Sequence, residues 1–524
     1  MNRRWVLQLS LAACVVTLGA GQAFSQVGGP LLSPEELAAR IDHHIAAKWA
    51  EKNIQPANRA GDAEFFRRLS LDVNGRIPTI VDLRDFQDDT RADKRRIWLE
   101  RLFEKKGTTE PGDAGLYVQH FTNYWRSVIF SQTTNQQGQF LANQLDPWLR
   151  RHLAQNTPYD QIVRELLTTP QGASFYQANE NKPEVIAGST ARLFLGVKLE
   201  CAQCHDDRSG GDWTRRQFWE YAAFFADFTP QRGMQQPNFR NGQPAKIKLP
   251  DKDETVEAKF LTGAVPEWRA NASAPTILAE WITTAENPFF ARATVNRMWH
   301  YFLGTGLVDP VDFMGTVENP PSHPELLDEL AYQFAAHKFD LKYLIRALIY
   351  SRAYQLTSVQ SHESQEDPRV FGRMAVRGLS PEQLFDNVQL ATGYRVSNTP
   401  NMGRGFPFQQ NGPRGEFIAR FSNNDKRTER QTSILQALFL MNGKFLTEAV
   451  EHQGGCLDKI ASAGAHVPTS KRIKELYIIS LSREPRSEEM ERMLKYVEAA
   501  GDQRKALSDI FWALLNSAEF ILNH

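Results

Sequence analysis

The sequence predicts a mainly α-helical protein, in which two helical domains are joined by a loop-rich segment with a small β element. Apolar residues recur at helical spacing over most of the 524 residues, and several helix starts are recognisable from their capping residues. The segment that lacks this helical spacing, at 231–270, is rich in Gly, Pro, Asn and Gln. We therefore predict a signal peptide at residues 1–25, a helical domain at 30–230, a linker at 231–270 and a second helical domain at 271–524.

The first 25 residues have the pattern of an export signal. Arg3 and Arg4 precede an apolar stretch at residues 5–20, and a small-x-small cleavage site follows at 23–25. A second interpretation is a lipoprotein signal cleaved before Cys14, which would leave that cysteine acylated. Both interpretations predict a mature protein outside the cytoplasm, in the periplasm or at the cell surface.

Three tetrapeptides predict the starts of helices, because each combines a capping hydroxyl with proline and an acidic or amide side chain near the first turn. They are SPEE at 33–36, SHPE at 322–325 and SPEQ at 380–383. Helical spacing of apolar residues predicts further helices over 65–71, 97–103, 117–130, 162–167, 341–349, 473–481 and 510–521.

Within the linker, two short runs alternate polar and apolar residues and predict small β-strands. These runs are KIKL at 246–249 and VEAKFL at 256–261. A later stretch, 401–424, is rich in Gly, Asn and Arg and predicts a surface loop.

Charge and composition exclude several classes of protein. Lys and Arg together number 61, as do Asp and Glu, so the chain lacks the excess of basic residues that is expected of a nucleic-acid-binding protein. Hydrophobic residues make up 41%, and only the first 25 or so residues could approach a membrane span, which argues against multispan insertion. The chain has 11 Trp, 13 Tyr and 32 Phe, which is more aromatic residues than a disordered protein contains, so disorder is also excluded.

The pentapeptide CAQCH at residues 201–205 is the strongest chemical signal in the chain. Its spacing is that of covalent haem attachment, in which two thiols add to the porphyrin vinyl groups and the adjacent imidazole binds iron. Cys201 and Cys204 would be the thioether anchors of one haem c, and His205 the proximal ligand of its iron.

Two other interpretations of this motif remain open. In an oxidising compartment the cysteine pair could close a disulfide or act as a redox-active dithiol. Cys201, Cys204 and His205 could also provide three ligands of a zinc site, which Cys456 would have to complete from a distant segment. By itself, Cys456 is expected to be a small buried apolar residue.

The segment after the motif is unusually aromatic, with seven Trp, Tyr or Phe residues between 213 and 228. Such side chains could cover a porphyrin. The spacing of Phe218, Tyr221, Phe225 and Phe228 is also that of a helix face in a hydrophobic core, which we consider the better interpretation.

Other residues are candidates by type alone. A sixth iron ligand could come from the following side chains: His120, His300, Met234, Met298 and Met314. A strong sixth ligand suits electron transfer, whereas an open position would allow oxidation chemistry.

Two groups of charged residues complete the candidates. Asp309 and Asp312 could do acid–base work, although a turn or capping role is expected beside proline. Arginines of one basic segment could hold an anion or haem propionates, or form a solvated loop: Arg404, Arg414, Arg420, Arg427 and Arg430. Nucleotide-binding and common hydrolase motifs are absent from the sequence.

Several longer motifs extend over nearly the whole mature sequence. In the first half they are FFRRLSLDVNGRIPT at 65–79 and FLGVKLECAQCHD at 194–206. In the second half they are NPFFARATVNRMW at 287–299, GTGLVDP at 304–310, NPPSHPELL at 319–327, SRAYQLTS at 351–358, QALFLMNG at 436–443 and ALLNSAEF at 513–520. Through these motifs the chain resembles a known family, the large two-domain planctomycete cytochrome-type proteins.

The resemblance implies an exported protein with an N-terminal cytochrome-like domain and a C-terminal helical domain whose role is not established. Relatives often continue the motif as CHDHP, whereas Asp207 and Arg208 follow here. If the second histidine of those relatives binds a metal, this chain lacks it.

The sequence therefore predicts a monohaem electron-transfer protein of the cell envelope, which would exchange electrons with a redox partner protein. An oxidoreductase that uses the iron on a substrate is a variant of this hypothesis. The alternative is a haem-free binding or scaffold protein with a Cys201–Cys204 disulfide.

Overall fold

The computed structural model describes residues 29–106, 115–131, 136–206, 213–226, 229–230, 237–238, 242–316, 318–395, 414–415, 417–418, 444–464 and 466–524. The predicted signal peptide, Cys14, Met234 and most of the 401–424 loop lie outside these residues. The described chain is mainly helical with a few short strands, which confirms the predicted fold class. No helix in this part of the chain is long and apolar enough to cross a bilayer.

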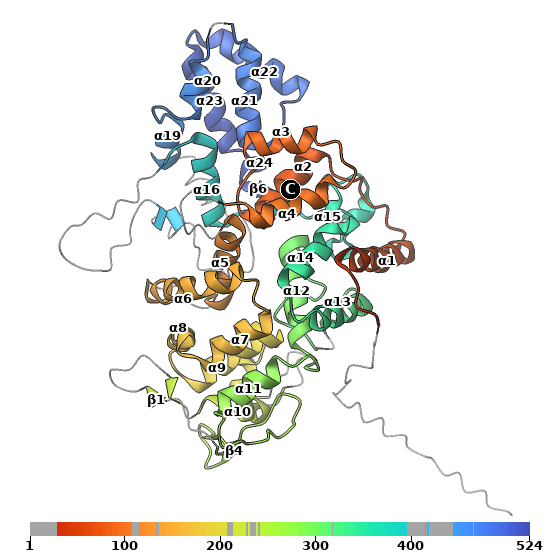
Figure 1. Ribbon diagram of the computed structural model, residues 1–524, viewed down its shortest axis with the longest axis vertical. Helices are drawn as coiled ribbons and strands as arrows, with labels where there is room; N and C mark the ends of the chain where they lie inside the picture. Colours follow the sequence, from red (N-terminus) through yellow and green to blue (C-terminus); the bar gives the residue numbers. More distant parts are fainter. Residues whose placement is uncertain are drawn as a thin grey trace, which may run out of the picture.

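The first half of the chain forms a series of short helices (Figure 1). From the N-terminal side they are α1 (Pro34–Lys52), α2 (Asp62–Asn74), α3 (Ile80–Asp88), α4 (Lys94–Glu104) and α5 (Leu116–Ile129). They continue as α6 (Gln136–Ala154), α7 (Tyr159–Thr168), α8 (Ala173–Ala178), α9 (Pro183–Thr190) and α10 (Arg215–Ala222). Shorter turns are η1 (Pro170–Gly172), η2 (Ala191–Leu195), η3 (Glu200–Gln203) and η4 (Ala223–Phe225).

The second half is also helical. Its first helices are α11 (Ala274–Ile282), α12 (Phe290–Leu303), α13 (Pro324–Ala336), α14 (Leu341–Tyr350), α15 (Arg352–Gln355) and α16 (Pro381–Thr392), with turns η5 (Glu363–Gln365) and η6 (Pro368–Val370). Its last helices are α19 (Lys444–Val450), α20 (Cys456–Ala461), α21 (Thr469–Leu481), α22 (Ser487–Ala500), α23 (Gln503–Leu515) and α24 (Ala518–Ile521).

The three predicted helix starts are confirmed, and two have the expected caps. Ser33 and Ser380 each accept a hydrogen bond from the backbone of the third helical residue, whose side chain bonds back to the cap. At α13 the cap is His323 rather than Ser322. Ser322 is engaged elsewhere, because its backbone N–H donates to the Leu307 carbonyl and its hydroxyl contacts the His323 ring nitrogen Nδ1 at 3.0 Å.

The helix expected over 510–521 is interrupted. α23 ends at Leu515, and Ser517 caps a new helix, α24, by accepting a hydrogen bond from the Phe520 N–H. The hydroxyl of Ser517 thus offers the backbone an alternative to continuing the first helix.

The strands are two or three residues long and pair antiparallel. β1 (Thr229–Pro230) pairs with β2 (Pro237–Asn238), and β3 (Lys246–Lys248) pairs with β4 (Thr255–Glu257) with Ile247 opposite Val256. The second hairpin confirms the predicted β element of the linker. β5 (Arg377–Gly378) pairs with β6 (Leu522–Asn523), a contact that the sequence pattern did not predict.

Two hydrophobic clusters hold the described residues together, and both halves of the chain contribute to each. The larger cluster extends from Leu37 to Ile478 and includes the contact of α1 with α14. The smaller cluster packs Leu71 and Ile77 of the first half against α16 and α19–α24. Figure 1 accordingly shows α2 and α3 beside the C-terminal helices.

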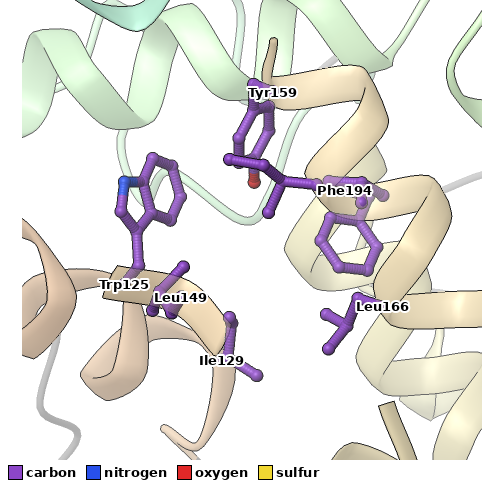
Figure 2. A pocket seen from close by; sticks show the side chains of 8 residues that line it. Trp125, Ile129, Leu149, Tyr159, Leu166 and Phe194 are labelled. Carbon is purple, nitrogen blue, oxygen red and sulfur yellow. The ribbon is translucent and has the colours of Figure 1, made fainter. Parts of the chain in front are cut away.

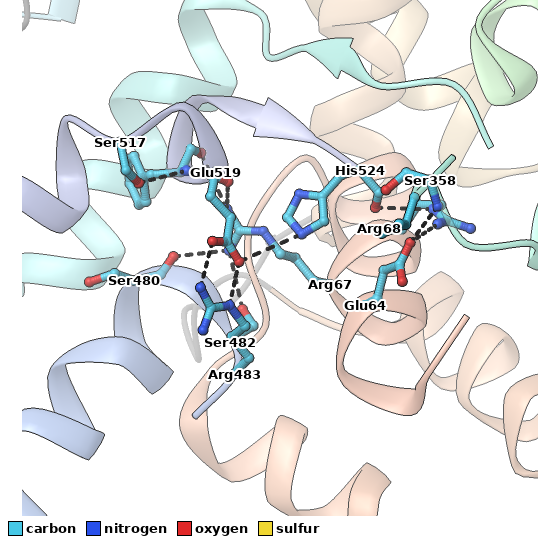
Figure 3. A network of polar contacts seen from close by, with 12 residues as sticks. Glu64, Arg67, Arg68, Ser358, Ser480, Ser482, Arg483, Ser517, Glu519 and His524 are labelled. Atoms are coloured by element: carbon cyan, nitrogen blue, oxygen red, sulfur yellow. Dashed lines mark hydrogen bonds and ion pairs between the residues drawn. The ribbon is translucent and has the colours of Figure 1, made fainter. Parts of the chain in front are cut away.

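Two consecutive arginines of α2 form hydrogen bonds that join this helix to distant segments of the chain (Figure 3). Both side chains are fully buried. Arg67 donates to the backbone carbonyls of Ser480 and Phe520, at 2.9 and 3.2 Å. Arg68 donates to the carbonyl of Tyr354 at 2.6 Å and pairs with Glu64 at 2.8 Å. Buried guanidinium groups need such acceptors, so the RR pair of the family-like motif has a structural role here.

Asp72, also on α2, is the centre of a second buried polar group. It is 1% exposed and accepts hydrogen bonds from the Tyr354 hydroxyl, the Arg377 guanidinium and the Asn523 amide, each at 2.8 Å. These donors belong to α15, β5 and β6. One carboxylate therefore joins four elements that are far apart in the sequence.

Candidate functional site

The CAQCH motif begins on η3, a single turn that follows an irregular end of α9, and Cys204 and His205 come directly after this turn. α9 continues into the π-helical turn η2, which ends at Gly196 with φ 65°. Glycine favours this left-handed conformation, and π-helical turns occur frequently at functional sites. After the turn, Leu199 and Ala202 are fully buried and anchor η3 to the hydrophobic core.

The three residues predicted to bind haem are presented outward from this anchored turn. Cys201 is half-buried, whereas Cys204 and His205 are exposed. Both sulfurs are free thiols. Leu199 and Ala202 are buried, whereas the cysteines are accessible. The apolar run before the motif can therefore pack in the core while both thiols remain accessible.

The neighbouring backbone orients the His205 ring. Its Nδ1 lies 2.9 Å from the carbonyl oxygen of Asp206. A carbonyl only accepts hydrogen bonds, so Nδ1 carries the proton, and in the neutral ring the lone pair is on Nε2. The Asp206 side chain in turn accepts from the Arg215 N–H at 2.8 Å, at the start of α10.

This donor set meets the chemical requirements of covalent haem attachment. Two accessible thiols can form thioethers, and Nε2 of His205 can bind iron while Nδ1 is hydrogen-bonded to a carbonyl. Among the described residues, no three His, Cys, Asp or Glu side chains are arranged to hold a metal ion.

Cys456 does not complete a site with the motif. It begins α20 and packs against the smaller hydrophobic cluster, where a Cβ at Gly393 would lie 3.3 Å from its sulfur. Burial raises the pKa of the Cys456 thiol, which makes it less reactive. The expectation of a buried residue at this position is met in part, since the side chain is half-buried.

The aromatic segment after the motif belongs to the hydrophobic core. Phe218, Tyr221, Phe224 and Phe225 are all fully buried, which supports the core interpretation over a porphyrin cover. Phe228 lies outside the described residues. Trp219 has a further role, because its indole N–H donates to the Gln203 carbonyl between the two cysteines, at 3.1 Å.

The candidate sixth ligands in the described chain have other contacts. His120 is buried, with Nε2 2.5 Å from the Tyr301 hydroxyl, and Met298 is fully buried in the larger cluster. His300 lies 3.7 Å from Asp309. The Met314 N–H donates to the carbonyl of Gly196, which lies five residues before Cys201, at 2.9 Å.

Asp312 has a role that the sequence did not suggest. Instead of capping a turn, its carboxylate binds Arg297 at 2.6 Å and lies 3.6 Å from Arg192. Neither Arg192 nor Arg297 was predicted from the sequence to be a site residue. A signal exists for Arg192, because it interrupts the otherwise apolar run 191–195, and a charge at such a position requires a buried partner. Arg297 has no such signal, since Asn296 and His300 lie in the same helix.

Arg414 of the basic segment contacts two residues of α16. It pairs with Asp386 at 3.3 Å and lies over the Phe385 ring at 5.9 Å, so this arginine is engaged within the protein. The other candidates for anion binding or for a solvated loop, Arg404, Arg420, Arg427 and Arg430, lie outside the described residues.

A small apolar cavity adjoins the η2 turn (Figure 2). Its lining includes Phe194 of η2, Trp125 and Ile129 of α5, and Tyr159 and Leu166 of α7. The cavity volume is about 10 Å³. Ligand pockets usually have roughly 300–1,000 Å³, so this space cannot enclose a porphyrin.

Comparison with known proteins divides the chain into two matched parts. Residues 40–229 match a family described as protein of unknown function DUF1549, and residues 276–416 and 415–497 match a family described as protein of unknown function DUF1553. The chain is similar to two families of unknown function. The matches are consistent with the expected two-domain organisation. No curated protein and no solved structure matches.

The two matches also locate the site residues. The CAQCH motif and Arg192 lie in the DUF1549 match, whereas Arg297 and Asp312 lie in the DUF1553 match. The turn before the motif is therefore contacted by residues of the other matched segment.

Proposed function

We propose that the protein is an electron-transfer protein of the cell envelope with one covalently attached haem. Cys201 and Cys204 would form the thioether bonds, and His205 would bind the iron. The observation that carries this proposal is the CAQCH turn itself, with accessible free thiols and the lone pair of His205 on Nε2. A bound haem would supply a one-electron redox centre.

The remaining parts of the turn have supporting roles in this proposal. Leu199 and Ala202 hold the turn against the core, so that attachment does not require the chain to unfold. The Asp206 carbonyl restrains the His205 ring through Nδ1. Trp219 restrains the backbone between the cysteines through the Gln203 carbonyl.

The proposed location is outside the cytoplasm. It is supported by the signal-like residues 1–25. This location agrees with the proposed haem, because covalent haem attachment takes place outside the cytoplasm. A redox partner protein would exchange electrons with the exposed side of the motif.

Haem loading of the full chain in a host with haem-attachment machinery tests this function. Wild type should carry one haem that survives a denaturing gel and acid–acetone extraction, whereas the double variant C201A/C204A should carry none. Cys456→Ala is the matched control, because it removes a cysteine from the other hydrophobic cluster and should leave haem loading unchanged.

Absence of covalent haem from the wild-type chain in such a host would refute the proposal. If the same material then showed Cys201 and Cys204 joined by a disulfide, as detected by the loss of two hydrogens in peptide mass spectrometry, the haem-free scaffold alternative would replace it.

A further inference from the structure

The turn before the CAQCH motif is supported by an ionic cluster made of two residues from each matched segment. Arg192 lies on η2 and Glu200 begins η3, whereas Arg297 and Asp312 come from the second half of the chain. Asp312 lies 2.6 Å from Arg297 and 3.6 Å from Arg192, and Arg192 lies 3.7 Å from Glu200. Glu200 is the residue immediately before Cys201.

The two arginines are buried and strongly constrained. Arg192 is 6% exposed, and its guanidinium also donates to the Ser131 hydroxyl at 3.0 Å. Burial lowers the pKa of Arg192, and the negative charge of Asp312 opposes this effect. Arg297 is 4% exposed and donates to the backbone carbonyls of Arg192 and Leu193, at 3.2 and 3.4 Å.

A second contact fixes the same turn from the same side. The Met314 N–H donates to the Gly196 carbonyl at 2.9 Å. A Cβ at residue 196 would lie 2.7 Å from the Met314 sulfur and 3.2 Å from the Ala293 Cβ. The second half of the chain thus packs directly on the backbone that leads into the motif.

We infer that Arg192 is a positioning residue for the CAQCH turn, held by Asp312 of the second matched segment and acting through Glu200. In this arrangement, Asp312 and Arg297 fix the Arg192 guanidinium, and Arg192 holds Glu200, so that Cys201 stays half-buried beside exposed Cys204. The second segment would therefore control how accessible the motif is. This inference deepens the proposed function, but its main test does not require haem.

The test compares alkylation rates of individual cysteines in the reduced full chain, produced without haem loading and treated with iodoacetamide. Arg192→Gln, Asp312→Asn and Glu200→Gln should each raise the rate at Cys201 by about fivefold, because each breaks a contact that resists local opening. The Glu200 side chain is 41% exposed, so Glu200→Gln is expected to fold even if a buried variant does not. Loss of this carboxylate and loss of the restraint both speed alkylation, so a Cys201 rate that does not rise in Glu200→Gln overturns the inference.

The direction in which Arg192→Gln changes the alkylation rate at Cys201 distinguishes loss of a positional restraint from loss of a nearby charge. Loss of a nearby positive charge alone would disfavour the thiolate and slow alkylation, whereas loss of a positional restraint speeds it. Slower alkylation or an unchanged rate in Arg192→Gln would overturn the inference. So would a parallel increase at Cys456, since that result would mean general destabilisation.

Arg346→Gln is the matched control. Arg346 forms a two-bond ion pair with Glu100, both contacts at 2.7 Å, on α14 and α4, which do not carry the motif. Its loss should leave the Cys201 rate unchanged, and a fivefold rise there would count against the inference. Haem loading of the wild type is scored separately, so failure of the proposed function and failure of this inference give different results.

Discussion

Asp72→Asn tests whether the buried carboxylate of α2 holds the four elements around it. The substitution preserves size but removes the charge that faces Arg377, whose side chain is 6% exposed. It also replaces one acceptor oxygen with a donor, so either the Asn523 amide or the Tyr354 and Arg377 donors lose their acceptor. A buried cation would remain without its anion.

The size of the effect follows from these contacts. Breaking a buried ion pair by removing one partner costs about 3–5 kcal/mol, and a hydrogen bond to a charged group contributes about 1.5–3 kcal/mol. We expect Asp72→Asn to lower the free energy of unfolding by about 3 kcal/mol or more. Glu100→Gln, at a pair with side chains 45% and 26% exposed, should cost less than about 1 kcal/mol.

Hydrogen exchange measured by mass spectrometry is the appropriate assay, because it reports α2 and β6 separately. In Asp72→Asn, peptides from both elements should lose protection together, since Asn523 of β6 bonds to the same carboxylate. An effect of Asp72→Asn no larger than that of Glu100→Gln would refute the reasoning. Loss of protection in α2 alone would show that β6 is held by other contacts.

Two further predictions concern pH and backbone strain. Burial raises the pKa of Asp42 to about 6, although its bond from the Arg352 N–H opposes the shift. The folded state then binds more protons than the unfolded state between about pH 4 and 6, so this group lowers stability as pH rises through that range. Asp42→Asn should stabilise the protein by about 1 kcal/mol at pH 7, allowing for partial exposure, and give no gain at pH 4, as measured by urea unfolding. Gly196→Ala should cost at least about 1 kcal/mol, because φ is 65° and the new methyl group meets Met314. In a Met314→Ala background the same change should cost less, because only its steric part is removed. No cost of Gly196→Ala in the Met314→Ala background, or an Asp42→Asn gain equal at both pH values, would contradict these two expectations.

Local sequence signals predicted the elements well where one segment determines its own conformation. The SPEE and SPEQ starts became capping boxes, because these structures depend on neighbouring residues. The first predicted run of the linker and the start of the second became a hairpin, but the second strand ends at Glu257, before most of the run predicted at 256–261. The SHPE start failed only in its cap, since Ser322 was used by a contact with Leu307. Helical spacing also assigned the aromatic residues around Tyr221 to the core.

Long-range partners could not be predicted in this way. Helical spacing indicates which face of α2 is buried, but not that Arg67 donates to a carbonyl 413 residues later. For the site, the motif named Cys201, Cys204 and His205 from spacing alone, and haem attachment remains a prediction. Arg192 and Asp312 lie more than a hundred residues apart, so their pairing depends on tertiary structure.

The anchoring of α2 has a consequence for the order in which the protein folds. The acceptors of Arg67 lie 413 and 453 residues further along the chain. Until those residues have been synthesised, the Arg67 guanidinium must stay hydrated, and α2 cannot pack into its final surroundings. Final packing of α2 is therefore a late event, and α2 would be accessible to chaperones for most of the synthesis of the chain.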